Sequence, residues 1–502
     1  MKIAVIGAGL SGLSAACHLS RSGHEVSVYE ASEHCGGRAG YFGDGGFHID
    51  NGPTVLTMTE LVANAIAATG STLDQHLELI RIEPGYRAFF AGPGGFDDDG
   101  VLSIYSSTQR MYEEIRANCS QRDADAYLRF VKYLTELYHA EFASFIDRNF
   151  SSLVDLARPV SAGLRLLRLG AFRRLDAVVK SYFDDPRLRK IFSFQALYAG
   201  LSPLDALAVY AIITYMDSVE GVWFPKGGMH QVAVAMEEAS RLAGVHYHYG
   251  ARVTQIVRRA DGVRDQVEAL IVDGIGRVDC DVVIATAELP LVYDELLDGL
   301  TTPPKLVTGE YSPSACLLLL GVNHVMPAGT THHNIFFGQG WESSFQALLR
   351  DGERMPDPSI LVSVPTVTDP SLAPSGSSIL YALEPVPNLS GQIEWSETRQ
   401  VVRDELVQRL TSWSLLQSTD SIVQEKMYDP TDWLEGGMAM GTPFGLSHRF
   451  FQSGPFRPSN VDKRVENLVF AGSCTVPGVG VPMVIISGKL AADRVKVLLG
   501  SQ

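Results

Sequence analysis

Residues 1–30, MKIAVIGAGLSGLSAACHLSRSGHEVSVYE, contain the pattern that decides the fold. The apolar run KIAVIG (2–7) predicts a short buried strand, and the segment from Leu10 to Gly23 predicts a helix that ends at the glycine. The run HEVSVYE (24–30) is rich in β-branched and aromatic residues and predicts a second strand. The chain therefore begins with a β-α-β unit.

Three glycines between the first strand and the helix have the spacing G-x-G-x-x-G. Gly7 permits a tight turn, Gly9 allows close approach of a pyrophosphate, and Gly12 allows tight packing of the helix on the strand. Glu30 ends the second strand, where a carboxylate can bind ribose hydroxyls and repel the 2′-phosphate of NADP. The loop predicts a dinucleotide site without separating NAD from FAD, and a structural glycine turn is the alternative.

The composition excludes several classes of protein. A chain of 502 residues predicts two or three domains, and its net charge of -16 argues against a nucleic-acid partner. Six cysteines are scattered without zinc spacing, which favours a reducing compartment and no metal site. The apolar runs are shorter than the about 18 residues that span a bilayer, and the chain starts directly with a strand, so we expect a cytoplasmic protein.

The segment EASEHCGGRAGYF (30–42) carries a second glycine turn followed by a cation, Gly36-Gly37-Arg38. Together with the first glycine loop, it resembles the FAD-dependent amine-oxidase and carotenoid-desaturase superfamily. The resemblance implies FAD as the cofactor, with Glu30 at the adenosine ribose and Arg38 on the diphosphate side.

Further segments resemble the bacterial phytoene desaturases of this superfamily. They are FHIDNGPTVLTM (47–58), GVWFPKGGMHQVAVAM (221–236) and NLVFAGSCTVPGVGVPMVIISGKLAA (467–492), and with the segments between them they cover most of the chain in the family's order. The implied activity is the introduction of conjugated double bonds into phytoene, to neurosporene- or lycopene-type products, by hydride transfer to flavin N5.

The resemblance also implies which residues bind FAD. Asp50 is expected near the flavin, with an Asx-turn as the alternative, and Val253 is expected to meet the adenine through its backbone. The last helix, starting near Pro482, is expected to aim its N-terminus at the pyrimidine edge of the flavin. The implied cofactor-binding residues are Gly7, Gly9, Gly12, Glu30, Gly36, Gly37, Arg38, Asp50, Gly52, Gly227, Gly228, Val253, Gly472, Gly478, Gly480 and Val481.

The predicted fold class is α/β: a discontinuous Rossmann-like FAD-binding domain with an inserted mixed α+β substrate domain and a helical membrane-associating region. The expected FAD-binding segments are residues 1–75, 225–298 and 455–502. Residues 76–224 are expected to form the helical substrate and membrane-associating region, and residues 299–454 the substrate domain of mixed strands.

Two residues are candidates for acid–base chemistry. Asp155 and Arg158 have the spacing that places them on one face of a helix, and they resemble an acid–arginine pair of the family proposed to act beside the flavin. A surface ion pair is the alternative. His332 and His333 are weaker candidates, because no further metal ligands accompany them.

Residues 158–180 combine six basic residues with a single acid and an apolar side, which predicts a helix at a membrane surface. A solvated basic helix packed on the protein is the alternative. The expected partners are a phytoene-like polyene, a peripheral membrane surface, and quinone or dioxygen as electron acceptor, while homo-oligomerisation is left open. Rival functions are a carotenoid isomerase, a desaturase of diapophytoene or of a hydroxylated carotenoid, and a non-enzymatic prenyl-binding escort of the same fold.

Overall fold

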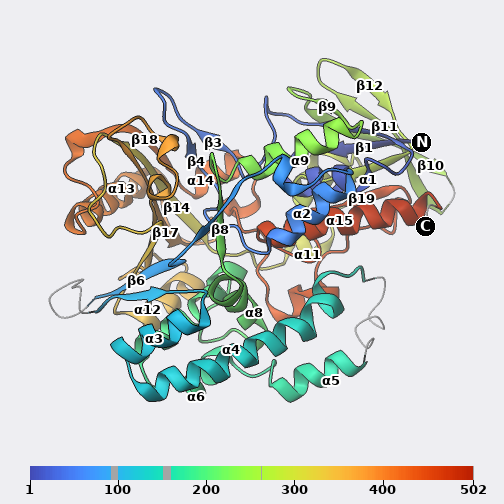
Figure 1. Cartoon of the computed structure of the whole chain (residues 1–502). Helices are drawn as coiled ribbons and strands as arrows, with labels where there is room; N and C mark the ends of the chain where they lie inside the picture. Colours follow the sequence, from blue (N-terminus) through green and yellow to red (C-terminus); the bar gives the residue numbers. More distant parts are fainter. Residues whose placement is uncertain (92–99, 151–159, 262, 501–502) are drawn as a thin grey trace.

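The computed structural model describes residues 1–91, 100–150, 160–261 and 263–500. Figure 1 shows two large sheets, one formed mainly by the ends of the chain and one by its middle, with a group of helices below both in the view. No helix in the described part of the chain is long and apolar enough to cross a membrane.

The first sheet is fully parallel, in the order β19-β13-β1-β2-β9. Its strands are β1 (Lys2–Ile6), β2 (Glu25–Tyr29), β9 (His246–His248), β13 (Val282–Ala285) and β19 (Leu468–Phe470). Helix α1 (Leu10–Leu19) joins β1 to β2, which confirms the predicted β-α-β unit. The sheet takes strands from the beginning, the middle and the end of the chain, and the fold class is α/β, whereas the domain boundaries stay a prediction.

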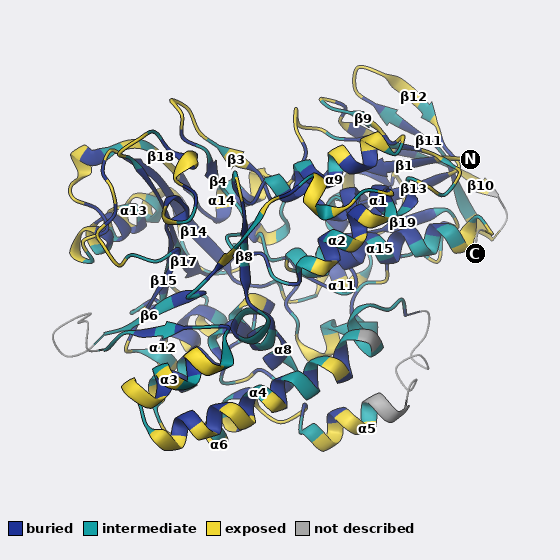
Figure 2. Cartoon of the chain, viewed as in Figure 1, coloured by how far each residue is buried: buried dark blue, intermediate teal, exposed yellow. Residues whose placement is uncertain are grey.

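Both faces of this sheet are covered, which explains why β1 and β13 are apolar almost throughout. Ile3 and Val5 of β1 pack under the helices α1, α2 (Thr59–Ala68), α9 (Gln231–Leu242) and α15 (Val481–Leu498). Ala4 and Ile6 point the other way, as the two-residue period of a strand requires. They pack against an antiparallel sheet of β10 (Val253–Asp261), β11 (Arg264–Val272) and β12 (Gly276–Asp279). Figure 2 shows β1 and β13 as buried between these layers.

The second sheet is mixed and has the order β18-β14-β17-β16-β15-β6-β7. Its strands are β6 (Tyr86–Phe90), β7 (Leu102–Ile104), β14 (Ser314–Val322), β15 (His333–Phe337), β16 (Ile360–Ser363), β17 (Ser378–Val386) and β18 (Ile422–Tyr428). Helix α13 (Trp395–Ser412) covers one face through Val402, Leu406 and Leu410. The alternate residues Leu317 and Leu383 face a cavity on the other side.

The region expected to be helical also contributes strands. It contains α3 (Thr108–Asn118), α4 (Gln121–Glu141), the π-helical turn η3 (Phe142–Ile146), α5 (Val160–Leu169), α6 (Leu175–Tyr182), α7 (Pro186–Ile191), α8 (Ala211–Tyr215) and η7 (Met216–Glu220). The same region supplies β6 and β7, as well as β5 (Leu79–Ile82) and β8 (Val222–Pro225), which pair with each other. These strands connect the helices to the second sheet, because β6 pairs with β15, and to the segment before α2, because Trp223 of β8 bridges to Leu56.

The crossing of α1 and α15 depends on Gly488. A Cβ atom added there would lie 2.2 Å from the carbonyl oxygen of Ser11 and 2.7 Å from Cβ of Ser14. We expect Gly488→Ala to push the two helices apart and to lower the free energy of unfolding by about 1–3 kcal/mol, measured by chemical denaturation. Gly163→Ala in α5 is the control, because nothing lies within 4 Å of its added Cβ and alanine favours a helix. An equal loss at both positions would contradict the prediction.

Candidate cofactor and substrate cavity

A cavity of about 1380 Å³ extends from the parallel sheet to the second sheet and the helices. Pockets for one small ligand typically measure about 300–1,000 Å³, so this cavity has room for more than one ligand. Gly7, Glu30, Thr286 and Ala471 line it where β1, β2, β13 and β19 end. This edge of a parallel sheet, at the carboxyl ends of the strands, is where α/β proteins bind their ligands.

The two glycine loops meet at this edge without side chains between them. Gly9 and Gly36 form a backbone bridge, and a Cβ added to Gly37 would lie 3.2 Å from Cα of Gly9. A Cβ on Gly12 would lie 2.0 Å from the carbonyl oxygen of Gly7, so the turn into α1 closes only around glycine. Gly9 caps α1 without a side-chain hydrogen bond, which leaves the first N–H groups of the helix available to an anion in the cavity.

Glu30 connects the two loops. Its Oε2 accepts a hydrogen bond from the N–H of Ala8 at 2.6 Å, and its Oε1 accepts from the N–H and the hydroxyl of Ser32 at 2.9 and 2.8 Å. The carboxylate lines the cavity. Arg252 and Val253, which are distant in the sequence, line the same cavity. Backbone N–H groups and the Ser32 hydroxyl therefore orient the Glu30 carboxylate in the cavity wall, and its role at a ribose stays a prediction.

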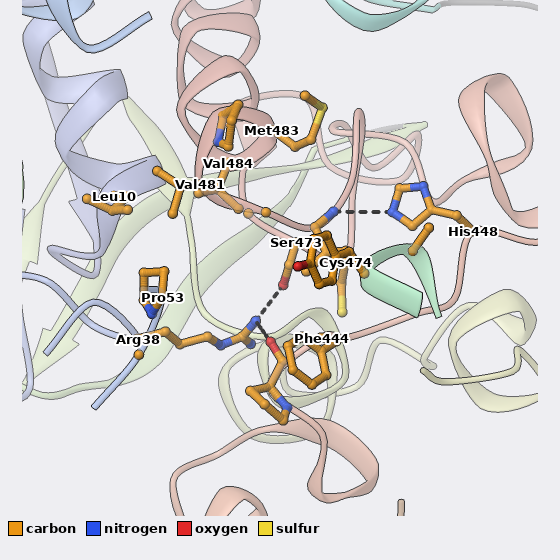
Figure 3. Close-up of a pocket in the computed structure, with 18 of the residues that line it drawn as sticks. Leu10, Arg38, Pro53, Phe444, His448, Ser473, Cys474, Val481, Met483 and Val484 are labelled. Carbon is orange, nitrogen blue, oxygen red and sulfur yellow. Dashed lines mark hydrogen bonds between the residues drawn. The ribbon is translucent and has the colours of Figure 1, made fainter. Parts of the chain in front are cut away.

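Arg38 belongs to a polar cluster that the sequence does not reveal (Figure 3). Its guanidinium donates to the carbonyl oxygen of Pro443 at 3.0 Å and to Oγ of Ser473 at 2.8 Å, and it forms an ion pair with Glu288. The thiol of Cys474 donates to the other oxygen of Glu288 at 2.6 Å. Because Glu288 follows β13, its place at the end of a parallel strand is the one signal that could have identified it.

His448 holds the loop before the last helix. Its Nε2 accepts a hydrogen bond from the N–H of Val479 at 3.3 Å (Figure 3), and Tyr210 donates its hydroxyl to the carbonyl oxygen of His448. Burial holds the pKa of His448 well below its usual value, so the ring is neutral and can act as this acceptor. Gly480, the N-cap of α15, and Val481, its first residue, follow this contact and line the cavity. Nothing in the sequence around His448 indicates this contact.

The predicted FAD-binding residues divide into two groups. Those that line the cavity are Gly7, Gly9, Glu30, Gly36, Gly37, Arg38, Gly52, Val253, Gly472, Gly480 and Val481. Gly12, Asp50, Gly227, Gly228 and Gly478 lie outside this lining.

Asp50 holds the turn before α9 instead of facing the cavity. Its carboxylate accepts hydrogen bonds from the N–H groups of Met229 at 2.7 Å and His230 at 3.1 Å. A Cβ on Gly228 would lie 2.8 Å from the same carboxylate, so this glycine permits the contact. Burial raises the pKa of Asp50 to about 7.

Asp155 and Arg158 lie outside the described residues, and their catalytic role stays a prediction. His333 lines the cavity, but its ring nitrogens lie 3.1 Å from the carbonyl oxygens of Gly85 and Thr54, and burial lowers its pKa to about 4. It connects β15 to the loop before α2. Among the residues that the structure describes, no group of three or more His, Cys, Asp or Glu side chains could hold a metal ion.

Comparison with known proteins agrees with these features. Residues 10–496 match the family described as flavin containing amine oxidoreductase. The chain is 45% identical over 496 residues to a phytoene dehydrogenase of Streptomyces griseus, covering 98% of this chain and 94% of that protein. It is 35% identical over 500 residues to a zeta-carotene-forming phytoene desaturase of Myxococcus xanthus, covering 98% and 93%. An oxidoreductase from Methanosarcina mazei has the same fold, with a TM-score of 0.62, 18% identity and coverage of 97% and 99%.

Two glycines of the last loop offer a test of the His448 contact. Both have positive φ angles, +147° at Gly478 and +110° at Gly480, so alanine strains the backbone at either position. An added Cβ would lie 2.1 Å from Cε1 of His448 at Gly478, whereas nothing lies within 4 Å at Gly480. We therefore expect Gly478→Ala to cost about 1–3 kcal/mol more unfolding free energy than Gly480→Ala, in denaturation of the protein stripped of cofactor. Equal costs would contradict the contact.

Proposed function

The chain belongs to the family of flavin-containing amine oxidoreductases, and from this premise we propose that it introduces conjugated double bonds into phytoene, to products of the neurosporene or lycopene type. It is an FAD-dependent carotenoid desaturase, an oxidoreductase acting on CH–CH groups. The observation that carries the choice of substrate is the cavity itself, which has glycine loops at one end and apolar walls over the rest.

The residues of the cavity fit FAD. We assign Glu30 to the adenosine ribose, the backbone of Val253 to the adenine and the N-terminus of α1 to the diphosphate, since the glycines there leave space that a Cβ would fill. The N-terminus of α15 at Val481 would face the flavin and stabilise negative charge on it. Bound FAD supplies the hydride acceptor, flavin N5.

Arg38 is shared between the protein and the cofactor. Three of its contacts, to Glu288, Ser473 and Pro443, are made inside the protein. A guanidinium has five N–H donors, so donors remain for the diphosphate side. Glu288 offsets part of the positive charge and orients the guanidinium at the same time.

The walls away from the glycine loops suit a hydrocarbon. Leu317 and Leu383 of the second sheet, Leu197, and Phe337 face the same space. A polyene precursor offers no polar group to bind, so the shape and length of the cavity must orient it, with each methylene contributing only about 1–3 kcal/mol of discrimination. We propose a quinone or dioxygen as the acceptor that reoxidises the flavin.

The cavity reaches a surface that suits a membrane. Leu167 and Phe172 line the cavity and are 62% and 44% exposed, and Phe450, which also lines it, contacts Phe172 with ring centroids 6.2 Å apart. Phe451 beside it is 75% exposed. The exposed basic residues Arg165, Arg168, Arg173 and Arg174 lie on the same segment of the chain. Apolar side chains next to cations in an acidic protein favour the interface of an anionic membrane, from which a polyene could enter.

Expression in a bacterium that accumulates phytoene tests the activity. We expect coloured carotenoids, and chromatography of the products will give the number of double bonds introduced. Gly37→Val is the matched control, because its side chain would enter the contact with Gly9 and prevent FAD binding, so cells with this variant should stay colourless. Colourless cells with the unchanged protein would contradict the proposal. If the protein converts diapophytoene but not phytoene, its substrate is the shorter polyene.

Binding to vesicles tests the membrane surface. Reversal of two charges, Arg165→Glu with Arg168→Glu, should weaken binding to anionic vesicles by at least about tenfold, since each basic residue contributes about 1 kcal/mol. Arg264→Glu with Arg277→Glu is the control, because these exposed arginines lie on β11 and β12, which are at the top of the view in Figure 1, whereas α5 is at the bottom. Flavin absorbance should stay unchanged in both variants. Equal vesicle binding by the two variants would refute this surface.

A further inference from the structure

Glu141 is a buried carboxyl group in the cavity wall. It is 4% exposed, lines the cavity, and its buried Oε1 has no hydrogen-bond partner among the described residues. Burial alone raises the pKa of Glu141 well above its usual range. Most buried polar groups are hydrogen-bonded, and an unpaired titratable group in a cleft is typical of a functional site.

The position of Glu141 in the fold is well defined. It is the last residue of α4, where the helix changes into the π-helical turn η3, a feature frequent at functional sites. Two contacts tie the residues after η3 to α15: Asp147 pairs with Lys489 at 2.6 Å, and Asn149 donates to the carbonyl oxygen of Leu490 at 3.0 Å. The residues that follow Glu141 are therefore tied to the middle of α15, the helix whose first residue lines the cavity.

A second connection leads from Glu141 to the flavin end through Tyr210. Burial, and to a smaller extent the carboxyl of Glu141, raises the pKa of Tyr210, and both side chains line the same cavity. Tyr210 in turn donates to the carbonyl oxygen of His448, and His448 accepts from Val479 next to the start of α15. Glu141 therefore lines the same cavity as Tyr210 and His448, the two residues that hold the loop before α15.

The surroundings of Glu141 contain two titratable groups that sense its charge, the hydroxyls of Tyr133 and Tyr210. Charged side chains on the elements packed against α4 are exposed or bonded to other groups: Arg110, Glu113, Glu114 and Arg116 on α3, Arg165 and Arg168 on α5, Asp176 and Lys180 on α6, and Asp147 after η3. Asp217, also in the cavity wall, accepts from Ser218 and Gln195. Among the described residues, no cation offsets the charge of an ionised Glu141.

We propose that Glu141 is the proton acceptor of the desaturation reaction. One C–H bond of the polyene breaks and its electron pair leaves as hydride to flavin N5. The C–H bond on the neighbouring carbon breaks, its electron pair forms the new C=C bond, and its proton passes to the carboxylate of Glu141. Loss of that proton to solvent, with reoxidation of the flavin by its acceptor, returns the enzyme to its starting state. This role rests on the proposed function.

The environment of Glu141 suits this role. A general base is most effective when its pKa lies near the operating pH, and an ordinary carboxylate is too weak a base to meet that condition. Burial raises the pKa of Glu141, which makes its carboxylate a stronger base, and the neutral form of the group does not repel a hydrocarbon. The ionised, reactive fraction grows as the pH rises, so the rate should rise with pH through the raised pKa.

The kinetic test uses purified, FAD-loaded protein with phytoene in vesicles. We expect Glu141→Gln to lower the desaturation rate by at least about 100-fold and to abolish its rise with pH. Glu141→Asp should retain that rise, because it keeps a carboxyl at the site. Asp217→Asn is the matched control: it alters another carboxyl of the same cavity and should preserve the dependence on pH.

A second measurement needs no turnover. The folded pKa of Glu141 is raised above its unfolded value, so the unfolded chain loses this proton at lower pH than the folded protein does. The wild type should therefore lose thermal stability relative to Glu141→Gln as the pH rises above the unfolded pKa, whereas the difference at lower pH stays constant. A difference in melting temperature that does not vary with pH would overturn the neutral, buried state of Glu141.

The outcomes separate the two proposals. If the wild type converts phytoene and Glu141→Gln does so at the same rate with the same pH profile, the role of Glu141 is wrong and the desaturase function stands. If the wild type converts no polyene under conditions in which its flavin is bound, the proposed function fails and the role of Glu141 fails with it. Flavin absorbance of each variant confirms that the site is folded.

Discussion

The structure depends on one constraint: at the turn from β1 into α1, backbone must contact backbone without side chains between. Gly12 lies against the carbonyl of Gly7, and Gly9 against the second glycine loop at Gly37. Only this approach opens the N-terminus of α1 towards the cavity. A second contact without a side chain occurs at Gly488, where α15 crosses α1. This crossing brings the N-terminus of α15 to the cavity.

Pairing and burial both reduce the charge inside the cavity. Arg38 is paired with Glu288, while burial lowers the pKa of His448 and raises the pKa of Glu141, which favours the neutral form of each. A buried charge without compensation is costly, and it would also disfavour a hydrocarbon beside it. The cavity therefore combines the donors that a dinucleotide needs with an environment that tolerates a long apolar ligand.

The features that the sequence predicted correctly depend on residues close together in the chain. The β1-α1-β2 unit and the position of Glu30 depend on residues within one turn or strand of each other, so glycine spacing and the period of apolar residues suffice. Glu288 and His448 were missed, because their partners are remote: Arg38 and Glu288 are 250 positions apart in the chain. The strands β6 and β7 were also missed, since β6 pairs with β15 from another region of the chain, and only the fold reveals that β6 and β7 complete a sheet.

The order of the strands in the parallel sheet also determines when, during synthesis, this sheet can be completed. β1 lies between β2, which is synthesised soon after it, and β13, whose Val282 pairs with Ile3. β19 and α15, which packs on α1, belong to the last segment of the chain. On a translating ribosome the first β-α-β unit therefore waits, with apolar surface uncovered, for most of the synthesis of the chain. The cavity wall is also completed late, because Gly480 and Val481 lie near the end of the chain. We therefore expect the apolar surface of the first unit to need protection until translation is nearly complete.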